Sequence, residues 1–296
     1  MPARSSPVTQ ADARARLPYV SPGRFARRRF GAPVFRVVVD AGFSCPVRDG
    51  RLSRGGCLFC SIDGFRPPTS RPHWSLAEQV RRALPRLRAR YPRAQGHLIY
   101  FQPYTNTYGD PRRLARLLAE ARGIEGTLGI SLATRPDALP PEMLGLLAEQ
   151  AREGFLQVEL GIQSTDERAL EIMERHHTWR DAQRAIAALR ERDIRVGAQM
   201  ILGTPWESRA SQLRGAARIS RAGVEAVKLH QLQLLRGSRL AARGPAATLR
   251  LPSATEYVTL AADFLERLAP EIVVERLVAR APRALLIAPR WESTPA

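Results

Sequence analysis

The chain has very little cysteine and almost no lysine. Three cysteines in 296 residues, an odd number, exclude a disulfide-stapled scaffold and favour a reducing, cytoplasmic environment. No segment approaches the roughly 18 consecutive apolar residues of a membrane-spanning helix, so we expect no membrane association. The amino-terminal region also lacks the apolar stretch of a secretory signal. These absences favour a globular intracellular protein.

The excess of basic residues has two interpretations. A net charge of +18 is typical of proteins that bind nucleic acid, which makes RNA a candidate partner. Of the 46 basic residues, however, only Lys228 is a lysine, and a bias toward GC-rich codons would raise arginine everywhere. The first 30 residues carry seven arginines and one acid. They predict a flexible basic N-terminal arm over residues 1–30.

Strand-like and helix-like segments alternate from residue 34 onward. The β-branched run at 34–39 predicts a strand, and Ser75 followed by Glu78 predicts a capping box that begins a helix over 76–90. Asp110 and Pro111 predict the start of the next helix. Further strands are predicted over 97–102, 126–133, 155–160, 194–202, 224–230 and 272–274, and further helices over 141–152, 165–174, 180–190, 208–222 and 256–268.

Alternating strands and helices indicate βαβ units and therefore a parallel sheet. Six such repeats before residue 231 favour an α/β fold of the partial (βα)6 TIM-like barrel type, and no Gly-x-Gly-x-x-Gly follows the first strand to indicate a dinucleotide fold. We predict one domain over 31–296, with a short C-terminal extension from about 232. In such barrels the chemistry lies at the carboxyl ends of the strands.

All three cysteines lie on one glycine-rich segment directly after the first strand. Cys45, Cys57 and Cys60 have the spacing Cys-x11-Cys-x2-Cys, which lets three thiolates converge on a metal centre. A closed zinc site needs four ligands, and His73 would have to be the fourth. An iron–sulfur cubane held by three cysteines instead leaves one iron open. Three unrelated buried thiols are the remaining interpretation.

Several motifs together resemble one family. Cys57-Leu-Phe59-Cys60 resembles the cluster motif of the radical S-adenosylmethionine superfamily, and residues 40–57 are similar to its YhcC-like branch, which is related to the catalytic subunit of Elongator. Further similar segments lie, in order, at 100–107, 133–137, 158–164, 201–205, 227–230 and 286–289. The resemblance extends over about residues 30–291.

The resemblance implies two cofactors and a reductant. Cys45, Cys57 and Cys60 would bind a [4Fe-4S] cluster whose open iron is chelated by S-adenosylmethionine (SAM). One electron from a flavodoxin- or ferredoxin-type partner would cleave SAM and give a 5′-deoxyadenosyl radical. That radical would abstract hydrogen from a substrate that the sequence does not identify. RNA is favoured by kinship and charge, and a metabolite or a peptide stays open.

The resemblance also assigns residues around SAM. They are expected to contact its adenine, its ribose, or the amino and carboxylate groups of its methionine part. Phe59 would pack beside the adenine, Gln102, Thr105 and Asn106 would lie near the amino group, Glu159 and Gln163 would contact ribose or methionine, Arg175 would bind the carboxylate, and Gln199 and Pro205 would border adenine and ribose.

Two further residues are predicted to act on the substrate. In Val-Lys-Leu-His, period-two alternation puts Lys228 and His230 on one face of the strand and the apolar residues on the other. The apolar face should pack on helices, which directs Lys228 and His230 into the lumen. There they would orient the substrate or move a proton. The alternative is that Lys228 has no role in the reaction, or only caps a backbone carbonyl. The competing hypothesis for the whole chain is a non-enzymatic zinc module that binds nucleic acid through its arginines.

Overall fold

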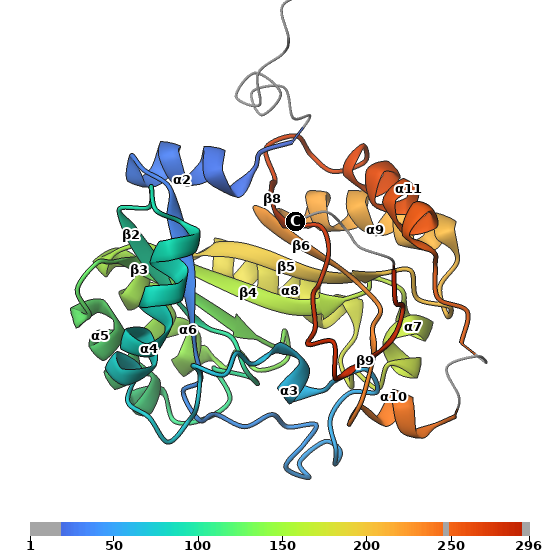
Figure 1. The fold of residues 1–296 in the computed structure, drawn as a ribbon, viewed down its shortest axis with the longest axis horizontal. Coiled ribbons are helices and arrows are strands. Elements are labelled where there is room, and N and C mark those ends of the chain that lie inside the picture. Colours follow the sequence, from blue (N-terminus) through green and yellow to red (C-terminus); the bar gives the residue numbers. More distant parts are fainter. Residues whose placement is uncertain (1–18, 245–248, 292–296) are drawn as a thin grey trace, which may run out of the picture.

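A computed structural model describes residues 19–244 and 249–291 and shows a curled parallel sheet (Figure 1). The sheet has seven strands in the order β1-β2-β3-β4-β5-β6-β8, and every neighbouring pair is parallel. The strands are β1 (Val34–Val39), β2 (Gly96–Phe101), β3 (Thr127–Thr134), β4 (Leu156–Gln163), β5 (Arg195–Leu202), β6 (Ala226–Gln231) and β8 (Val273–Arg276). The predicted partial TIM-like barrel is confirmed, with β8 as a seventh strand.

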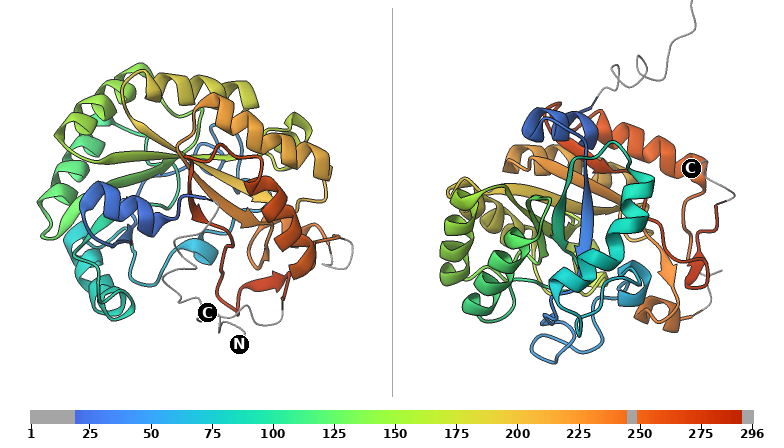
Figure 2. Two further views of the ribbon diagram at one scale, coloured as in Figure 1. Left: turned by 90° about the horizontal axis from the view of Figure 1, so that it is seen from above. Right: turned by 60° about the vertical axis from the view of Figure 1, so that its left-hand side comes forward.

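Helices cover the outer face of this sheet, as Figure 2 shows from above. The long helices are α4 (Leu76–Arg90), α5 (Pro111–Gly123), α6 (Pro141–Glu153), α8 (Trp179–Arg190), α9 (Arg209–Ala222) and α11 (Ala254–Leu265). The short ones are α3 (Ile62–Phe65), α7 (Glu167–Ile172) and α10 (Arg239–Ala242). In the described residues, no helix is both long and apolar enough to cross a membrane.

The main core lies between the sheet and these helices. On α5, Leu114, Leu118 and Ala121 are completely buried, at the spacing that gives a helix one apolar face. They pack against the outward-pointing apolar residues of the strands, such as Ile130 and Leu132 of β3. The inward-pointing positions are thereby left to polar residues, because successive side chains of a strand point to opposite faces.

The predicted caps at Ser75 and Asp110 are confirmed except in one detail. Ser75 accepts a hydrogen bond from the backbone N–H of Glu78, and Asp110 does the same for Arg112. The second half of the capping box at Ser75 is wrong, because the Glu78 carboxylate pairs with Arg81 and Arg82 instead. The two guanidiniums one helical turn further on compete successfully for that carboxylate.

The prediction of a flexible arm over residues 1–30 is wrong for its last part. Residues Pro22–Phe30 form helix α2, which begins at an N-cap serine, Ser21, and ends at Gly31 with φ +76°. Phe25 and Phe30 pack on Phe155, with ring centroids 6.0 and 5.1 Å away, so apolar contacts fix this basic helix. Residues 1–18 of the predicted arm lie outside the described residues.

Helix α2 lies across the amino ends of the strands. Phe155 directly precedes β4, and Arg195, the first residue of β5, places its guanidinium 4.2 Å from the centre of the Phe25 ring. Just before α2, Val20 forms a parallel bridge to Val273 of β8. The end of the barrel opposite the expected site is therefore covered by the chain's own first helix.

The region after residue 231, predicted as an extension, completes the barrel. A two-residue strand β7 (Leu234–Leu235) pairs antiparallel with β9 (Leu286–Ala288). Between them the chain forms α10 and α11 and returns as β8, which pairs with β6. The C-terminal segment thus supplies both an outer helix and the last strand of the main sheet.

We predict that Phe155→Ala lowers the free energy of unfolding by about 3 kcal/mol, because it removes the ring on which α2 packs. Trypsin should also cut faster at Arg27, Arg28 and Arg29, which lie on α2. Urea denaturation and limited proteolysis measure the two effects. Val258→Ala, at a position that is 63% exposed, is the control. Equal stability of the two variants would contradict the prediction.

Candidate functional site

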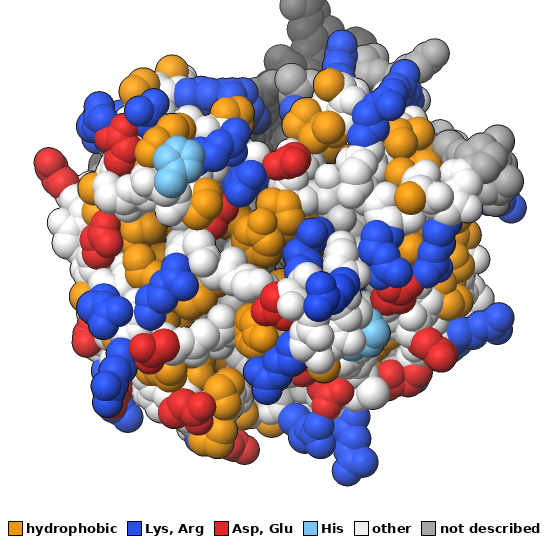
Figure 3. Space-filling model, turned by 90° about the horizontal axis from the view of Figure 1, so that it is seen from below, with side chains coloured by type: hydrophobic (Ala, Val, Ile, Leu, Met, Phe, Trp, Pro, Cys, Tyr) orange, Lys and Arg blue, Asp and Glu red, His pale blue; other side chains and the backbone are white. Residues whose placement is uncertain are grey.

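A cavity of about 550 Å³ opens at the carboxyl ends of the strands. Its wall combines the cysteine segment, the ends of strands β2 to β6, and the loop after β8. Figure 3 shows the molecule from below, the side toward which the cysteine segment lies in Figure 1, with arginine side chains spread over the whole face. The cavity lies where parallel barrels carry out their chemistry.

Backbone hydrogen bonds fix the cysteine segment in place. The N–H of Gly56 donates to the carbonyl of Val47 at 2.7 Å, and the N–H of Leu58 donates to that of Met173 at the end of α7. The carbonyl of Leu58 accepts from Leu240 of α10. Gly56 has φ +90°, and a Cβ there would lie 2.8 Å from the Arg48 guanidinium. The turn therefore requires glycine both for its backbone and for the approach of Arg48.

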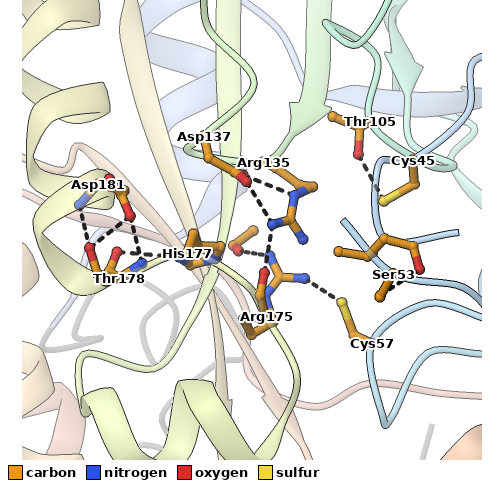
Figure 4. A network of polar contacts seen from close by, with 12 residues as sticks. Cys45, Ser53, Cys57, Thr105, Arg135, Asp137, Arg175, His177, Thr178 and Asp181 are labelled. Atoms are coloured by element: carbon orange, nitrogen blue, oxygen red, sulfur yellow. Dashed lines mark hydrogen bonds and ion pairs between the residues drawn. The ribbon is translucent and has the colours of Figure 1, made fainter. Parts of the chain in front are cut away.

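Each cysteine sulfur accepts one hydrogen bond from a polar side chain. Thr105 Oγ1 donates to Cys45 at 3.2 Å, and Arg175 Nη1 donates to Cys57 at 3.0 Å (Figure 4). Arg48 Nη2 donates to Cys60 at 3.1 Å. Burial raises the pKa of Cys60 to about 11, although Arg48 opposes the shift. Two guanidiniums and one hydroxyl thus place a hydrogen-bond donor against each of the three sulfurs.

The cysteines fit a cubane better than a single zinc ion. In the described ranges, no three His, Cys, Asp or Glu side chains converge as one bound ion would require. His73, the fourth zinc ligand in the alternative prediction, is exposed and packs on Trp74 instead of lining the cavity. Thiolates of a [4Fe-4S] cluster bind different irons and need not meet at one point. Three free cysteines around one cavity provide that ligand set.

A second group of polar residues lies beside Cys57 (Figure 4). Arg135 donates two hydrogen bonds to Asp137, at 2.9 and 2.8 Å, and a third to the carbonyl of Arg175. Arg175 also donates to the carbonyl of Gly161. Burial, together with the charges of Arg175 and Arg135, lowers the pKa of the adjacent His177 to about 3. This histidine is therefore neutral.

Within the described residues, four buried polar atoms of cavity-lining side chains have no hydrogen-bond partner. They are Arg66 Nε, Arg135 Nη1, Arg175 Nε and Gln163 Oε1. Gln163 also has φ +72°, a conformation that is strained for a side chain of this kind. Buried polar groups are normally hydrogen-bonded, so three donors and one acceptor are free for a polar ligand. The methionine part of SAM carries groups of both kinds.

Ten of the fourteen predicted site residues line this cavity. They are Cys45, Cys57, Phe59, Cys60, Gln102, Thr105, Gln163, Arg175, Gln199 and His230. Asn106, Glu159, Pro205 and Lys228 do not line it. Asn106 instead donates from its amide nitrogen to the carbonyls of Phe101, Pro103 and Ala133, and it thereby fixes the loop after β2. Pro205 is exposed.

Glu159 and Lys228 belong to a buried ionic cluster inside the barrel. The two side chains form an ion pair, and Tyr100 donates to Glu159 at 2.6 Å. Arg36 of β1 lies 3.6 Å from Glu159 and donates two hydrogen bonds to Glu275 of β8. The cluster therefore links β1, β4, β6 and β8 across the lumen, with two positive and two negative charges.

The cluster shifts two pKa values. Burial, reinforced by Arg36, lowers the pKa of Lys228 to about 8, even though Glu159 and Glu275 attract its proton. Burial alone would raise the pKa of Glu275, but Arg36 and Lys228 lower it to about 2. Glu275 is thus held as a carboxylate by its cationic neighbours.

His230 shares the lumen face with Lys228 but lines the cavity. Its Nδ1 lies 3.4 Å from the amide nitrogen of Gln199, and Arg276 Nη1 lies 3.4 Å from its Nε2. Burial and the charges of Arg276 and Lys228 lower the pKa of His230 well below its usual value. A neutral imidazole that accepts a hydrogen bond from Arg276 at Nε2 carries its proton on Nδ1. The amide of Gln199 must then be flipped, so that its oxygen rather than its NH2 group faces Nδ1.

Sequence reasoning missed several residues that the fold brings to the site. Arg48 was missed although it stands three residues after Cys45, and Arg135 although it lies in a motif similar to the family's. Glu275 and Arg276 were missed because nothing in a short strand near the C-terminus indicates that it pairs with β6. A charged residue inside an otherwise apolar strand was the available signal.

Comparisons with known proteins agree with this geometry. Residues 50–211 match the sequence profile of the Radical SAM superfamily, and residues 224–295 match that of the Radical_SAM C-terminal domain. Protein YhcC of Escherichia coli strain K12 is 33% identical over 265 residues, which are 89% of this chain and 84% of that protein. YtqA of Bacillus subtilis is 34% identical over 90% of this chain and 82% of its own length.

A solved structure shows the same fold at low identity. Elp3 of the archaeon Methanocaldococcus infernus, with its N-terminus deleted, superposes with a TM-score of 0.59 at 14% identity. The match covers 82% of this chain and 55% of that one, so this chain spans about half the length of Elp3. At this identity the likeness concerns the fold of the barrel alone.

We predict that Glu275→Gln lowers the free energy of unfolding near neutral pH by about 3 kcal/mol, because Arg36 and Lys228 lose an anionic partner. A carboxyl whose folded pKa is about 2 stabilises the fold above its ordinary value of 4.5, and this stabilisation is lost as the pH falls toward 2.

The difference in stability between wild type and Glu275→Gln should therefore shrink between pH 4.5 and 2. Urea denaturation across that range measures it. Glu271→Gln, at an exposed position close to β8, is the control. A difference that stays constant over the whole range would contradict the pairing of Glu275.

Proposed function

The chain belongs to the radical S-adenosylmethionine superfamily, whose cofactors are a [4Fe-4S] cluster and SAM, and we propose that it abstracts a hydrogen atom from a substrate at this cavity. The observation that carries the proposal is the set of three free thiols on one fixed segment, each facing a hydrogen-bond donor. The cofactor prediction made from the cysteine motif is confirmed by the family.

We propose that Cys45, Cys57 and Cys60 hold the cluster. The charges of Arg48 and Arg175 beside two of the sulfurs would offset the negative charge of the bound thiolates. Arg175 also donates to the carbonyl of Gly161, which would keep its charge beside Cys57. This preorganisation would favour cluster assembly.

SAM would bind next to the cysteines, among the other predicted site residues that line the cavity. The free donor of Arg175 suits a carboxylate, and the unpartnered amide oxygen of Gln163 suits an ammonium or hydroxyl group. Phe59, Gln102, Thr105 and Gln199 complete this wall. When bound and reduced, the pair of cofactors supplies a 5′-deoxyadenosyl radical, and the protein's own part is to position the groups and exclude water.

Three predicted SAM contacts have other partners in the structure. Glu159 is engaged by Lys228 and Tyr100, and the Asn106 amide by three carbonyls. Pro205 lies outside the cavity wall. We propose that these three residues support the structure around the site and do not contact SAM. His230 lines the cavity and stays our candidate for orienting the substrate. Lys228 lies deeper in the barrel and would act through His230, whose pKa its charge helps to lower.

The proposal also names a substrate class, a redox partner and a location. RNA stays a prediction that rests on the excess of arginine. We also propose a flavodoxin- or ferredoxin-type electron donor and a cytoplasmic location, both of which follow from the need to keep thiols and cluster reduced.

The central experiment reconstitutes the protein with iron and sulfide under anaerobic conditions, reduces it and adds SAM. The proposal expects a brown protein, and 5′-deoxyadenosine and methionine detected by mass spectrometry. A colourless protein that holds one zinc ion tightly would support the competing zinc module. A brown protein that forms no 5′-deoxyadenosine would refute the proposed reaction.

We predict that Cys45→Ala, Cys57→Ala and Cys60→Ala each abolish retention of the cluster, because two thiolates cannot anchor a cubane. Iron content and the visible spectrum after gel filtration measure this. Leu52→Ala, at an exposed position on the same segment, is the control and should retain full iron. A cysteine variant with full iron would show that this cysteine is not a ligand.

We predict that Arg175→Gln weakens SAM binding about ten- to a hundredfold, the effect of losing a charge-assisted hydrogen bond worth about 1.5–3 kcal/mol. Calorimetry on the reconstituted protein measures the affinity. Iron content is determined in parallel, since Arg175 also contacts Cys57. Arg168→Gln, on the exposed surface of α7, is the control. Unchanged affinity at full iron content would remove Arg175 from the SAM site.

A further inference from the structure

The charged side chains along the cavity wall are all basic. Among the residues that the structure describes, seven arginines line it and no aspartate or glutamate does. The chain as a whole has 28 acidic residues for 46 basic ones, so a general excess of arginine does not by itself account for the complete absence of carboxylates. The arginines are Arg48, Arg66, Arg86, Arg135, Arg175, Arg276 and Arg280.

Four of these arginines already have partners. Arg48 and Arg175 donate to cysteine sulfurs. Arg135 is paired with Asp137, and Arg66 is paired with Asp40 at 3.1 Å and Asp63 at 3.2 Å. These four are therefore committed to the cysteine segment and its surroundings.

The other three form no ion pair within the described residues. Arg276 and Arg280 lie at and after the end of β8, and Arg86 lies on α4, which packs on β1. All three are exposed. In the described part of the chain, the one side-chain hydrogen bond that any of them forms is that of Arg276 with His230, at 3.4 Å. The cavity thus carries unneutralised positive charge on the two walls formed by the edge strands and their neighbours.

The segment that presents Arg276 and Arg280 is held rigidly. Between them, the backbone of Ala279 is bound at both polar groups by one buried side chain. Gln231 Oε1 accepts from the N–H of Ala279, and Gln231 Nε2 donates to its carbonyl, both at 2.9 Å. Gln233 adds a weaker bond to the same carbonyl. A buried amide that holds a loop by two bonds preorganises the side chains on either side of it.

Resting on the proposed function, we propose that Arg276, Arg280 and Arg86 bind a phosphate group of the substrate at the mouth of the cavity. Guanidinium groups match phosphate oxygens in charge and in bidentate geometry. Three guanidiniums on two walls offer more hydrogen-bond donors than the two oxygens of one carboxylate accept. A phosphate group, with several free oxygens, suits them better. His230, beside Arg276, then faces the part of the substrate that extends from the phosphate toward the cysteines.

The phosphate has two sources that this chemistry does not separate, a small phosphomonoester and the phosphodiester chain of RNA. Ribose 5-phosphate probes the first, by calorimetry, and a labelled twelve-nucleotide single-stranded RNA probes the second, by fluorescence anisotropy. Both are added to the reconstituted full chain saturated with SAM. Citrate serves as a probe for carboxylate binding.

The test compares wild type with the double variant Arg276→Gln/Arg280→Gln. The control, Arg112→Gln/Arg116→Gln, removes the same charge from exposed arginines on α5, outside the cavity wall. At least one phosphate probe should bind wild type and the control alike and bind the double variant at least tenfold more weakly. Whichever probe shows that loss identifies the source of the phosphate.

Three results would overturn the inference. They are no binding of either phosphate probe, an equal loss in the control, and binding of citrate alone. Cluster content and 5′-deoxyadenosine formation are measured in the same samples. A protein that cleaves SAM but gives one of these results keeps the proposed function and loses the phosphate site, whereas a protein without cluster or cleavage loses the proposed function itself.

Discussion

The four buried charges of Arg36, Glu159, Lys228 and Glu275 are the constraint on which the shape of the barrel depends. They come from β1, β4, β6 and β8, and each pairs with a charge on a different strand. Charges removed from water are tolerated only when they are paired, so the strands must curl until the pairs meet. Arg36 and Glu275 in particular connect the first and last strands of an open sheet.

This balanced layer separates two regions of different electrostatic character. Below it, α2 covers the amino ends of the strands with aromatic contacts. Above it, the cavity wall is basic and holds unpartnered polar atoms at Arg135, Gln163 and Arg175. Because the charges of the layer cancel one another, the positive potential of the cavity is set by its own arginines.

Much of the fold could be predicted because local patterns are strong here. The alternation of strands and helices gave the barrel, and three clustered cysteines indicated the metal centre. Period two placed Lys228 and His230 correctly in the lumen, but it gave no depth along the barrel, so it could not tell the buried Lys228 from the cavity-lining His230. Depth depends on how neighbouring strands are staggered, and this is a property of the sheet rather than of one strand.

Other features depend on contacts that are distant in sequence. Nothing local indicates that Phe25 and Phe30 pack on Phe155, so a basic stretch was interpreted as a flexible arm. In the same way, Glu275 is an ordinary acid in the sequence, and only its pairing with Arg36 from 239 residues earlier makes it part of the barrel. Glu159 was assigned to SAM because the strand pattern predicts that its side chain faces the lumen, whereas its ion pair with Lys228 could not be predicted.

Because Lys228 is buried, the accessibility of this one side chain measures how often the barrel opens. Lys228 is the only lysine among 46 basic residues, and its side chain is 5% exposed. A protease specific for lysine therefore has one cleavage site, at the centre of the lumen, and it can cut only molecules whose barrel has come apart. Amine-reactive reagents likewise have one side-chain target, so the rate of labelling measures how often the strands separate around the ion pair with Glu159.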